Sequence, residues 1–167
     1  MHRAILDFAR RCYTDHLIEG RVIDVGALDV NGALSQVIPI DLRVDMQEGK
    51  GVDLVMPAEK LIDHFGHESW DHVVSADMLE HAENWRAVMR SMWGLIKPGG
   101  TLLLTMASIH KGRHAYPDDY WRFPMVDFLR LFGENQILAT MSHRISIGAF
   151  VRKTHPLNLD IDPVEVP

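Results

Sequence analysis

Two carboxylates and a glycine in the first third of the sequence have the types and spacing to bind a nucleoside-like ligand. The stretch Asp24-Val25-Gly26-Ala27-Leu28-Asp29-Val30-Asn31-Gly32 is a glycine-punctuated turn after an apolar run. Gly26 lets the backbone approach a ligand closely, and we expect Asn31 to cap a helix that begins near Gly32. Asp45 lies 19 residues after Gly26, close to the ~20 residues at which a carboxylate reaches a ribose diol. The alternative is an ordinary tight turn and a solvent-facing aspartate.

A histidine in the middle of the sequence has the chemistry of a general base. Leu79-Glu80-His81 follows a β-type segment, and an imidazole with a pKa near neutrality suits proton transfer. We therefore predict catalytic roles for His81 and for its neighbour Glu80. The alternative is that His81 orders the loop or caps the next helix.

An arginine among aromatic residues could form an acceptor pocket. These residues belong to the segment Tyr116-Pro117-Asp118-Asp119-Tyr120-Trp121-Arg122-Phe123. Tyr120 and Arg122 could stack on and neutralise a planar or anionic acceptor. Alternatively, Trp121 and Phe123 seat the next helix on the sheet, and Arg122 pairs with the two aspartates.

The elements that must position these residues alternate between strand and helix patterns. We expect strands at residues 21–26, 40–44, 52–55, 72–75, 101–106, 136–140 and 144–151, and helices at 3–19, 57–65, 85–96 and 125–132. The continuous apolar run at 101–106 is typical of a strand covered on both faces, whereas the last two strands alternate like an antiparallel pair. This order predicts a single α/β domain with a Rossmann-like, doubly wound, mostly parallel sheet and an antiparallel C-terminal strand pair.

The carboxyl ends of the strands are the expected ligand site of such a sheet, near the switch in strand order. This rule places the glycine-punctuated turn, Asp45, residues 75–81 and the loop after the 101–106 strand around one crevice. Leu28 replaces the second glycine of a dinucleotide loop, and no Tyr-x-x-x-Lys pair follows the fourth strand. Both features disfavour an NAD enzyme.

Composition excludes several other classes of protein. Of 167 residues, 47% are hydrophobic and 24% charged, and the formal net charge is −6. This composition is that of a soluble globular protein, whereas a nucleic-acid partner usually needs a basic surface. Cys12 is the one cysteine, charged residues occupy the place of a signal peptide, and no apolar run approaches the ~20 residues of a membrane helix. We therefore expect a cytoplasmic protein with no membrane or nucleic-acid partner.

Four motifs follow one another in the first two thirds of the sequence. They are Val22–Gly32, then Val44-Asp45-Met46 with Gly49–Val55, then Trp70–His81, and finally Leu95-Ile96-Lys97-Pro98-Gly99-Gly100-Thr101-Leu102-Leu103-Leu104-Thr105. Together they resemble the class I S-adenosylmethionine-dependent methyltransferases, in particular the small type 11 branch. The resemblance covers about Gly20 to Thr105, with weaker similarity to Phe132, and its motifs are specific for the family but for no substrate.

The resemblance implies that S-adenosyl-L-methionine is the cofactor and assigns residues to it. Asp45 would hold the ribose hydroxyls and Met46 would pack on the adenine, although Met46 and Met56 could equally be core methionines. Pro57 stands where the family often has an acidic residue that accepts from the adenine amine, so another group must take that role. The cofactor residues that the resemblance implies are Asp24, Gly26, Ala27, Leu28, Asn31, Asp45, Met46, Met56, Pro57, Ala58, Ser75, Ala76 and Asp77.

Two further patterns concern metals and nucleic-acid bases. Asp77, Glu80 and His81 have an acid-x-x-acid-His spacing that resembles a divalent-cation motif of some related quinone and RNA methyltransferases. We expect no metal, because the sequence identifies no further carboxylate ligand. No Asn/Asp-Pro-Pro-Tyr/Phe pattern follows the fourth strand, which counts against methylation of a base.

The resemblance leads to three expected parts and one expected activity. The parts are an N-terminal amphipathic helix (1–20), a methyltransferase core (21–153) and an acidic, flexible tail (154–167). We predict methyl transfer to a small-molecule acceptor, at oxygen, by in-line displacement at the sulfonium methyl. The catalytic residues would be His81, Glu80, Tyr120 and Arg122. The alternative is a catalytically inactive S-adenosylmethionine-binding module or partner subunit, and a homodimer could close the site.

Overall fold

A seven-stranded sheet forms the centre of the protein, whose computed structural model describes residues 3–16, 18–114, 118–133 and 136–166. Its strands are β1 (Val22–Val25), β2 (Leu42–Asp45), β3 (Leu54–Val55), β4 (Trp70–Ala76), β5 (Ile96–Ala107), β7 (Gln136–His143) and β8 (Ser146–Arg152). Across the sheet they lie in the order β3-β2-β1-β4-β5-β8-β7. The strands β1 to β5 pair in parallel, whereas β8 is antiparallel to β5 and β7. This topology confirms the expected fold class.

Strand β5 is deeply buried in its second part because β4 and β8 flank it and other elements cover both of its faces. Its residues 100–107 are all buried, as the apolar run at 101–106 predicts. The strand begins earlier than expected, at Ile96, which pairs with Trp70. The pairing then shifts register before His72 meets Thr101, which accommodates the bulging residues 97–100.

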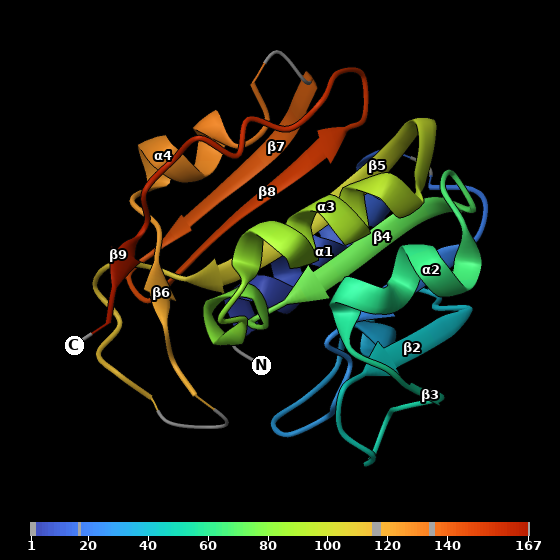
Figure 1. Ribbon diagram of the computed structural model, residues 1–167, viewed down its shortest axis with the longest axis horizontal. Helices are drawn as coiled ribbons and strands as arrows, with labels where there is room; N and C mark the ends of the chain where they lie inside the picture. The colour runs from blue at the N-terminus through green and yellow to red at the C-terminus, as the bar shows by residue number, and fades with distance from the viewer. Residues whose placement is uncertain (1–2, 17, 115–117, 134–135, 167) are drawn as a thin grey trace.

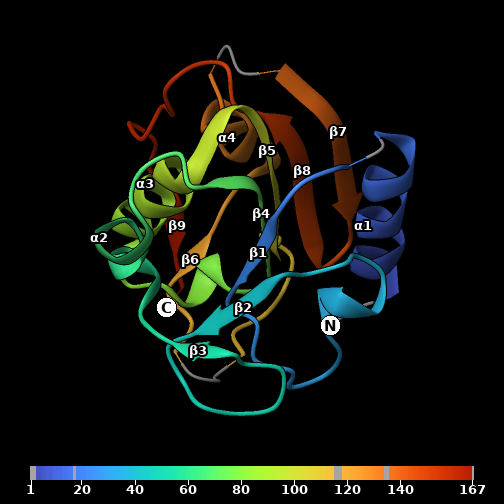
Figure 2. The same cartoon turned by 90° about the vertical axis from the view of Figure 1, so that its right-hand side faces the viewer.

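Helices cover the two faces of the sheet (Figures 1 and 2). Among the described α-helices, α1 (Arg3–Asp15) covers one face, whereas α2 (Leu61–Phe65), α3 (Trp85–Leu95) and α4 (Met125–Arg130) cover the other. The buried side of α1 consists of Ile5, Phe8, Ala9 and Cys12. These side chains pack against the sheet together with Val74, Leu103 and Phe150. Position 17, which we expected in this helix, lies outside the described residues.

The connection from β1 to β2 differs from the expectation. We expected a helix near Gly32 with Asn31 as its cap, but the chain forms only a 3₁₀ turn, Leu34–Gln36. The N-cap residue of this turn is Ala33, which has no side-chain group to form a capping hydrogen bond. Asp29 instead accepts a hydrogen bond from the Gly32 N–H at 2.7 Å. Val37, Ile38 and Pro39 follow at once, and a proline disfavours helical backbone at the residue before it.

The acidic tail makes more contacts than its composition led us to expect. Arg86 on α3 donates hydrogen bonds to the carbonyl oxygens of Leu159 and Ile161 at 3.1 and 2.7 Å. Farther on, the two-residue strand β9 (Val164–Glu165) pairs with β6 (Trp121–Arg122) in a small second sheet. Ile161 is buried in the core on the α3 side. The tail therefore covers part of the helical face (Figure 1).

The described helices include no membrane span. None of them is both long and apolar enough to cross a lipid bilayer.

Removing the buried side chain of the tail tests this packing. We expect Ile161→Ala to lower the free energy of unfolding by about 2–3 kcal/mol, because Ile161 is only 6% exposed. The matched control Val164→Ala, on a side chain that is 53% exposed, should change it by less than about 0.5 kcal/mol. Urea unfolding followed by tryptophan fluorescence measures both values. Equal, small effects would show that the tail does not pack on the core.

Candidate functional site

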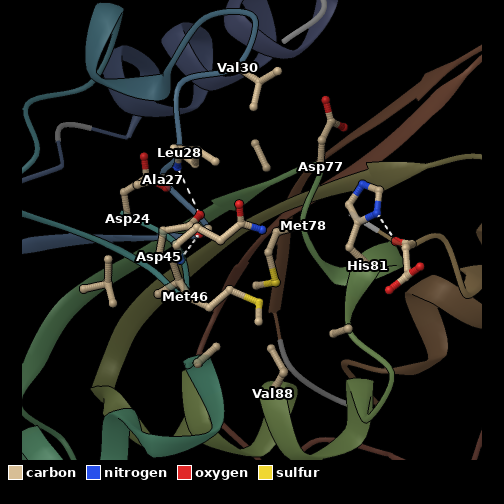
Figure 3. Close-up of a pocket in the computed structure, with 18 of the residues that line it drawn as sticks. Asp24, Ala27, Leu28, Val30, Asp45, Met46, Asp77, Met78, His81 and Val88 are labelled. Atoms are coloured by element: carbon tan, nitrogen blue, oxygen red, sulfur yellow. Dashed lines mark hydrogen bonds between the residues drawn. The ribbon is translucent and has the colours of Figure 1, made fainter. Parts of the chain in front are cut away.

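A pocket of about 700 Å³ opens at the carboxyl ends of β1, β2 and β4 (Figure 3). Asp45 and Met46 lie on one side of it, and Asp77, Met78 and His81 lie on the other. Its wall contains these residues that the sequence singled out: Asp24, Gly26, Ala27, Leu28, Asn31, Asp45, Met46, Met56, Pro57, Ala58, Ala76, Asp77, His81 and Tyr120. Ser75, Glu80 and Arg122 do not line the pocket and lie buried behind its wall.

The turn after β1 is held tightly against β2. The N–H groups of Gly26 and Ala27 both donate to the Val44 carbonyl, at 2.9 and 3.1 Å. Gly26 has a positive φ of +83°, and a Cβ there would lie 2.4 Å from Cγ of Met78. Only glycine fits this bend without displacing Met78 from the pocket wall.

The carboxylate of Asp45 is fixed at the end of β2. Its Oδ2 accepts a hydrogen bond from the Leu28 N–H at 3.1 Å, and its Oδ1 accepts one from the Gln47 N–H at 2.9 Å. An ionised carboxylate has about four lone-pair sites, so both oxygens can accept further hydrogen bonds. The backbone thus orients Asp45 and leaves acceptor capacity on the pocket side.

An ion pair joins the two loops beside Asp45. Lys50 Nζ lies 2.6 Å from Asp29 Oδ2, and the Asp29 N–H donates to the Lys50 carbonyl. The hydrogen bond from Lys50, followed by that from the Gly32 N–H, lowers the pKa of Asp29. This contact joins the turn after β1 to the loop after β2, and the sequence alone did not indicate it.

Two acidic residues, one in β1 and one directly after β4, lie in unusual surroundings. Burial, followed by the charge of Asp45, raises the pKa of Asp24 to about 7. Asp77 has a positive φ of +51°, which is uncommon outside glycine, and its Oδ1 is buried with no hydrogen-bond partner among the described residues. Strained backbone and an orphaned oxygen together are typical of a ligand-binding position.

The residues that the resemblance assigned to the adenine end all line the pocket, but they differ in how far they are buried. Met46 is 64% exposed and lines the pocket, so it is no core methionine. Met56 is half-buried and contributes both to the core and to the pocket wall. Pro57 and Ala58 lie at the start of the 3₁₀ turn Ala58–Lys60, and the next residue, Glu59, also lines the pocket. The sequence analysis missed this carboxylate.

Ser75 supports the site from behind. It is fully buried, and its hydroxyl donates to the Val25 carbonyl at 2.7 Å. This bond ties β4 to the end of β1, so Ser75 helps to position the strand ends and does not itself face the pocket.

Two histidines meet at the other end of the pocket. His81 belongs to the 3₁₀ turn Leu79–His81, and its Nδ1 makes a short hydrogen bond to the Asp118 carbonyl. The ring centroid of His114 lies 4.9 Å from that of His81. Burial, followed by the charge of Lys111, lowers the pKa of His114, so its ring is neutral at pH 7. No motif in the sequence pointed to His114. Only its position in the loop after β5, at the edge of the sheet where ligands bind, could have suggested a role.

Tyr120 also lines this end of the pocket. Partial burial, followed by the charges of Asp118 and Glu83, raises the pKa of its hydroxyl. Tyr120 is therefore a protonated hydrogen-bond donor at neutral pH. Tyr116 and Pro117, from the same expected acceptor segment, lie outside the described residues.

Arg122 has a structural position. Its guanidinium is 4% exposed and forms a two-pronged ion pair with the buried carboxylate of Asp119. It also donates to the carbonyl oxygens of Lys111 and Gly112, each at 3.1 Å. Burial alone would raise the pKa of Asp119, but hydrogen bonds from Arg122 and the His114 N–H outweigh it and lower the pKa to about 2. Arg122 thus holds the loop that carries His114. Of the two aspartates with which the alternative paired Arg122, it pairs with Asp119.

The aromatic neighbours of Arg122 also face inward. Trp121 Nε1 donates a hydrogen bond to the Ala82 carbonyl at 2.9 Å. The ring of Phe123 packs edge-on against that of Trp85, with 5.2 Å between the ring centroids. These contacts pack the segment against α3, whereas the alternative that we gave had Trp121 and Phe123 seat the next helix on the sheet.

Glu80 is completely buried beneath the two histidines. Its Oε1 accepts a hydrogen bond from the Ala107 N–H at 3.1 Å, and its Oε2 has no partner among the described residues. Burial, followed by the charge of Asp77, raises the pKa of Glu80 well above its ordinary value. Glu80 contacts the elements around the pocket and does not reach the pocket itself.

Known proteins share this fold and these motifs. The family model for a methyltransferase domain matches residues 20–104, just over half of the chain. No curated protein matches the sequence at a significant level. The chain belongs to the class I S-adenosylmethionine-dependent methyltransferases, which confirms the resemblance in its motifs.

Solved structures with the same fold have diverged far in sequence. A Thermotoga maritima methyltransferase, described as a possible histamine N-methyltransferase, superposes with a TM-score of 0.67 at 17% identity over 92% of this chain and 91% of its own. The Burkholderia thailandensis 1,6-didemethyltoxoflavin-N1-methyltransferase, with 1,6-didemethyltoxoflavin and S-adenosylhomocysteine bound, gives 0.65 at 16% over 91% and 79%. An O-methyltransferase family protein from the same organism gives 0.59 at 14% over 90% and 55%. The fold thus serves both N- and O-methyltransferases.

Adding a methyl group at the glycine bend tests the turn after β1. We expect Gly26→Ala to destabilise the protein by about 1–2 kcal/mol through its positive φ, and by about 1–3 kcal/mol more through the clash with Met78. Gly66→Ala is the matched control, because Gly66 has a φ of +80° and open space around its Cβ position. Urea unfolding should show the larger loss for Gly26→Ala, and equal losses would exclude the clash.

The raised pKa of Asp24 makes stability depend on pH. Its carboxyl keeps a proton to about pH 7 in the folded state but loses it near 3.8 when unfolded. The free energy of unfolding should therefore fall as pH rises through this window, by up to about 4 kcal/mol. Asp24→Asn removes this loss, so the variant should gain stability relative to wild type between pH 4.5 and 7.5 in urea unfolding.

The control for this pH dependence is Asp53→Asn. The hydrogen bond from Arg43 lowers the pKa of Asp53 from its ordinary 3.8, so Asp53 stays ionised in both the folded and the unfolded state between pH 4.5 and 7.5. The stability difference between Asp53→Asn and wild type should therefore stay constant over this range. A difference between Asp24→Asn and wild type that does not vary with pH would contradict the assignment.

Proposed function

We propose that this pocket binds S-adenosylmethionine and directs its methyl group to a hydroxyl oxygen of a small-molecule acceptor. The observation that carries the proposal is the fixed carboxylate of Asp45 facing the pocket beside the glycine bend at Gly26. When bound, S-adenosylmethionine would supply an electrophilic methyl group on a positively charged sulfur. The chain itself needs to align the reactants and accept a proton.

The adenosine would lie at the Asp45 end of the pocket. Both oxygens of Asp45 keep acceptor capacity, which suits two ribose hydroxyls. The exposed thioether of Met46 would cover one face of the adenine, with Met56, Pro57 and Ala58 at its edge. Glu59 would accept from the adenine amine, the role that the Pro57 side chain cannot take.

The methionine part would lie between the ends of β1 and β4. Gly26, Ala27, Leu28 and Asn31 would form one wall, with Ala76 opposite and Ser75 supporting it from behind. The cofactor's ammonium group would complement two carboxylates of the described pocket, Asp24 and the orphaned oxygen of Asp77. Ionisation of Asp24, costly in the free protein, would then be offset by this positive charge.

The acceptor would lie between His81 and Tyr120. Because the Asp118 carbonyl can only accept, Nδ1 of His81 carries a proton and Nε2 of the neutral ring has a free lone pair. His81 would therefore accept the acceptor's hydroxyl proton, and Tyr120 would donate a hydrogen bond to it. Glu80 and Arg122 would act as positioning residues, since neither reaches the pocket.

Removing the charge of Asp45 tests the cofactor site. We expect Asp45→Asn to weaken S-adenosylmethionine binding about 10–100-fold in calorimetry, because charge-assisted hydrogen bonds to the ribose are lost. Asp53→Asn, which removes an exposed carboxylate paired with Arg43 outside the pocket, should bind like wild type. Thermal unfolding of both variants checks that they remain folded, and equal affinities would remove Asp45 from the site.

Turnover separates an enzyme from a binding module. Incubation with S-adenosylmethionine and a panel of small hydroxylated acceptors should release S-adenosylhomocysteine, and less in His81→Ala than in wild type. Cofactor binding without release of this product on any acceptor would favour the inactive module or partner subunit.

A further inference from the structure

We infer that Glu80, His81 and His114 form a binding site for one divalent cation of the first transition row at the acceptor end of the pocket. One ligand atom from each residue lies within 4.8 Å of the other two. Two of the ligands, His81 and His114, line the pocket, while Glu80 closes the cluster from below. Cation binding by this cluster does not require the proposed methyl transfer, but a cation on Nε2 of His81 would occupy the lone pair that the proposed function uses for proton transfer. With the cation bound, the cation and not His81 would activate the acceptor's hydroxyl.

The buried carboxylate of Glu80 is the first argument. Its side chain is 0% exposed, and the Ala107 N–H satisfies Oε1 at 3.1 Å. Oε2 is buried and has no hydrogen-bond partner within the described part of the chain. A carboxylate in such a place is costly unless it is paired or binds a cation. The basic nitrogen Nε2 of His114 lies 4.0 Å from Oε1.

The orientation of His81 is the second argument. Its Nδ1–H donates to the backbone carbonyl of Asp118. Metal-bound histidines usually donate their other ring N–H to a carbonyl or carboxylate, which fixes the ring and its tautomer. Nε2 of His81 therefore carries the lone pair that a cation needs.

His114 is oriented in the same manner. Its Nε2 lies 3.2 Å from Lys111 Nζ, which can only donate, so Nε2 is the acceptor and Nδ1 carries the proton of the neutral ring. That Nδ1–H points to Asp119 Oδ2 at 3.0 Å, whereas Arg122 Nη2, 3.3 Å from Nδ1, is itself a donor and acts on His114 only through Asp119. A metal site requires its ligands to be held rigidly, and the Arg122–Asp119 pair holds His114 in this way.

The Lys111 ammonium shows that a positive charge is electrostatically favourable beside Glu80 and His114. It approaches the lone pair of His114 Nε2, and its charge also faces Glu80. A bound metal ion would compete with Lys111 for this nitrogen, so the lysine must swing away when the ion enters.

The donor set narrows the kind of cation. Two imidazoles and one carboxylate suit Zn²⁺, Mn²⁺, Fe²⁺ or Co²⁺, whereas Mg²⁺ and Ca²⁺ prefer all-oxygen ligands. Three protein ligands leave coordination positions open toward the pocket. A hydroxyl that binds there would lose its proton more easily. This last consequence, unlike cation binding itself, rests on the proposed function.

Titration with a metal alone tests the site. Full-length protein stripped with a chelator should bind one equivalent of Co²⁺, seen in its visible absorption spectrum, and one of Zn²⁺ in calorimetry. We expect His114→Ala and Glu80→Gln each to weaken binding at least about tenfold. His110→Ala is the matched control, because His110 is exposed on the same loop and is no member of the cluster.

Lys111→Met gives a test in the opposite direction. Without the competing ammonium, this variant should bind Co²⁺ more tightly than wild type. Should Glu80→Gln fail to fold, His81→Ala removes a ligand that is only half-buried. The inference is overturned if wild type binds no stoichiometric metal, or if His110→Ala weakens binding as much as His114→Ala does.

Cofactor calorimetry on the same samples separates the two proposals. His114→Ala should keep its affinity for S-adenosylmethionine while losing the metal. If wild type binds Co²⁺ but no S-adenosylmethionine, the metal site stands and the proposed function falls. If it binds S-adenosylmethionine but no Co²⁺ or Zn²⁺, the metal site alone is wrong.

Discussion

Parallel pairing of β1 with both β2 and β4 is the constraint on which the site depends. Val25 pairs with Val44 on one side, and Asp24 pairs with Val74 on the other. Parallel strands must end at the same edge, so the turn after β1, the carboxylate of Asp45 and the strained Asp77 are forced together. Backbone hydrogen bonds then fix the details, because the Leu28 N–H and the Val44 carbonyl link the first two strand ends.

Much of this arrangement could be predicted because it follows from local pattern and spacing. The apolar run at 101–106 and the interval between Gly26 and Asp45 each depend on short stretches of chain. The expected helix near Gly32 was wrong because Asp29 forms the turn and Pro39 follows closely. The position of Arg122, by contrast, could not be predicted from local pattern. Only tertiary packing decides whether an arginine among aromatic residues faces a pocket or a buried aspartate.

The two ends of the pocket are built in different ways. The Asp45 end is made mainly by backbone groups of consecutive strand ends, which a sequence motif can encode. The His81 end depends on side chains from segments far apart in the chain: Glu80 and His81 follow β4, whereas His114, Asp119 and Arg122 follow β5. The contact of Glu80 and His81 with His114 joins two segments that no spacing rule relates, so His114 was found only in three dimensions.

The pairing of β9 with β6 also brings the end of the chain close to the acceptor end of the pocket. The Val166 N–H donates to the carbonyl of Tyr120 at 2.8 Å, and Tyr120 is part of the pocket wall. Strand β9 itself does not line the pocket, but this bond ties it to the backbone of a residue that does. Substitutions in this two-residue strand can therefore shift the pocket wall at Tyr120 without any change in the central sheet.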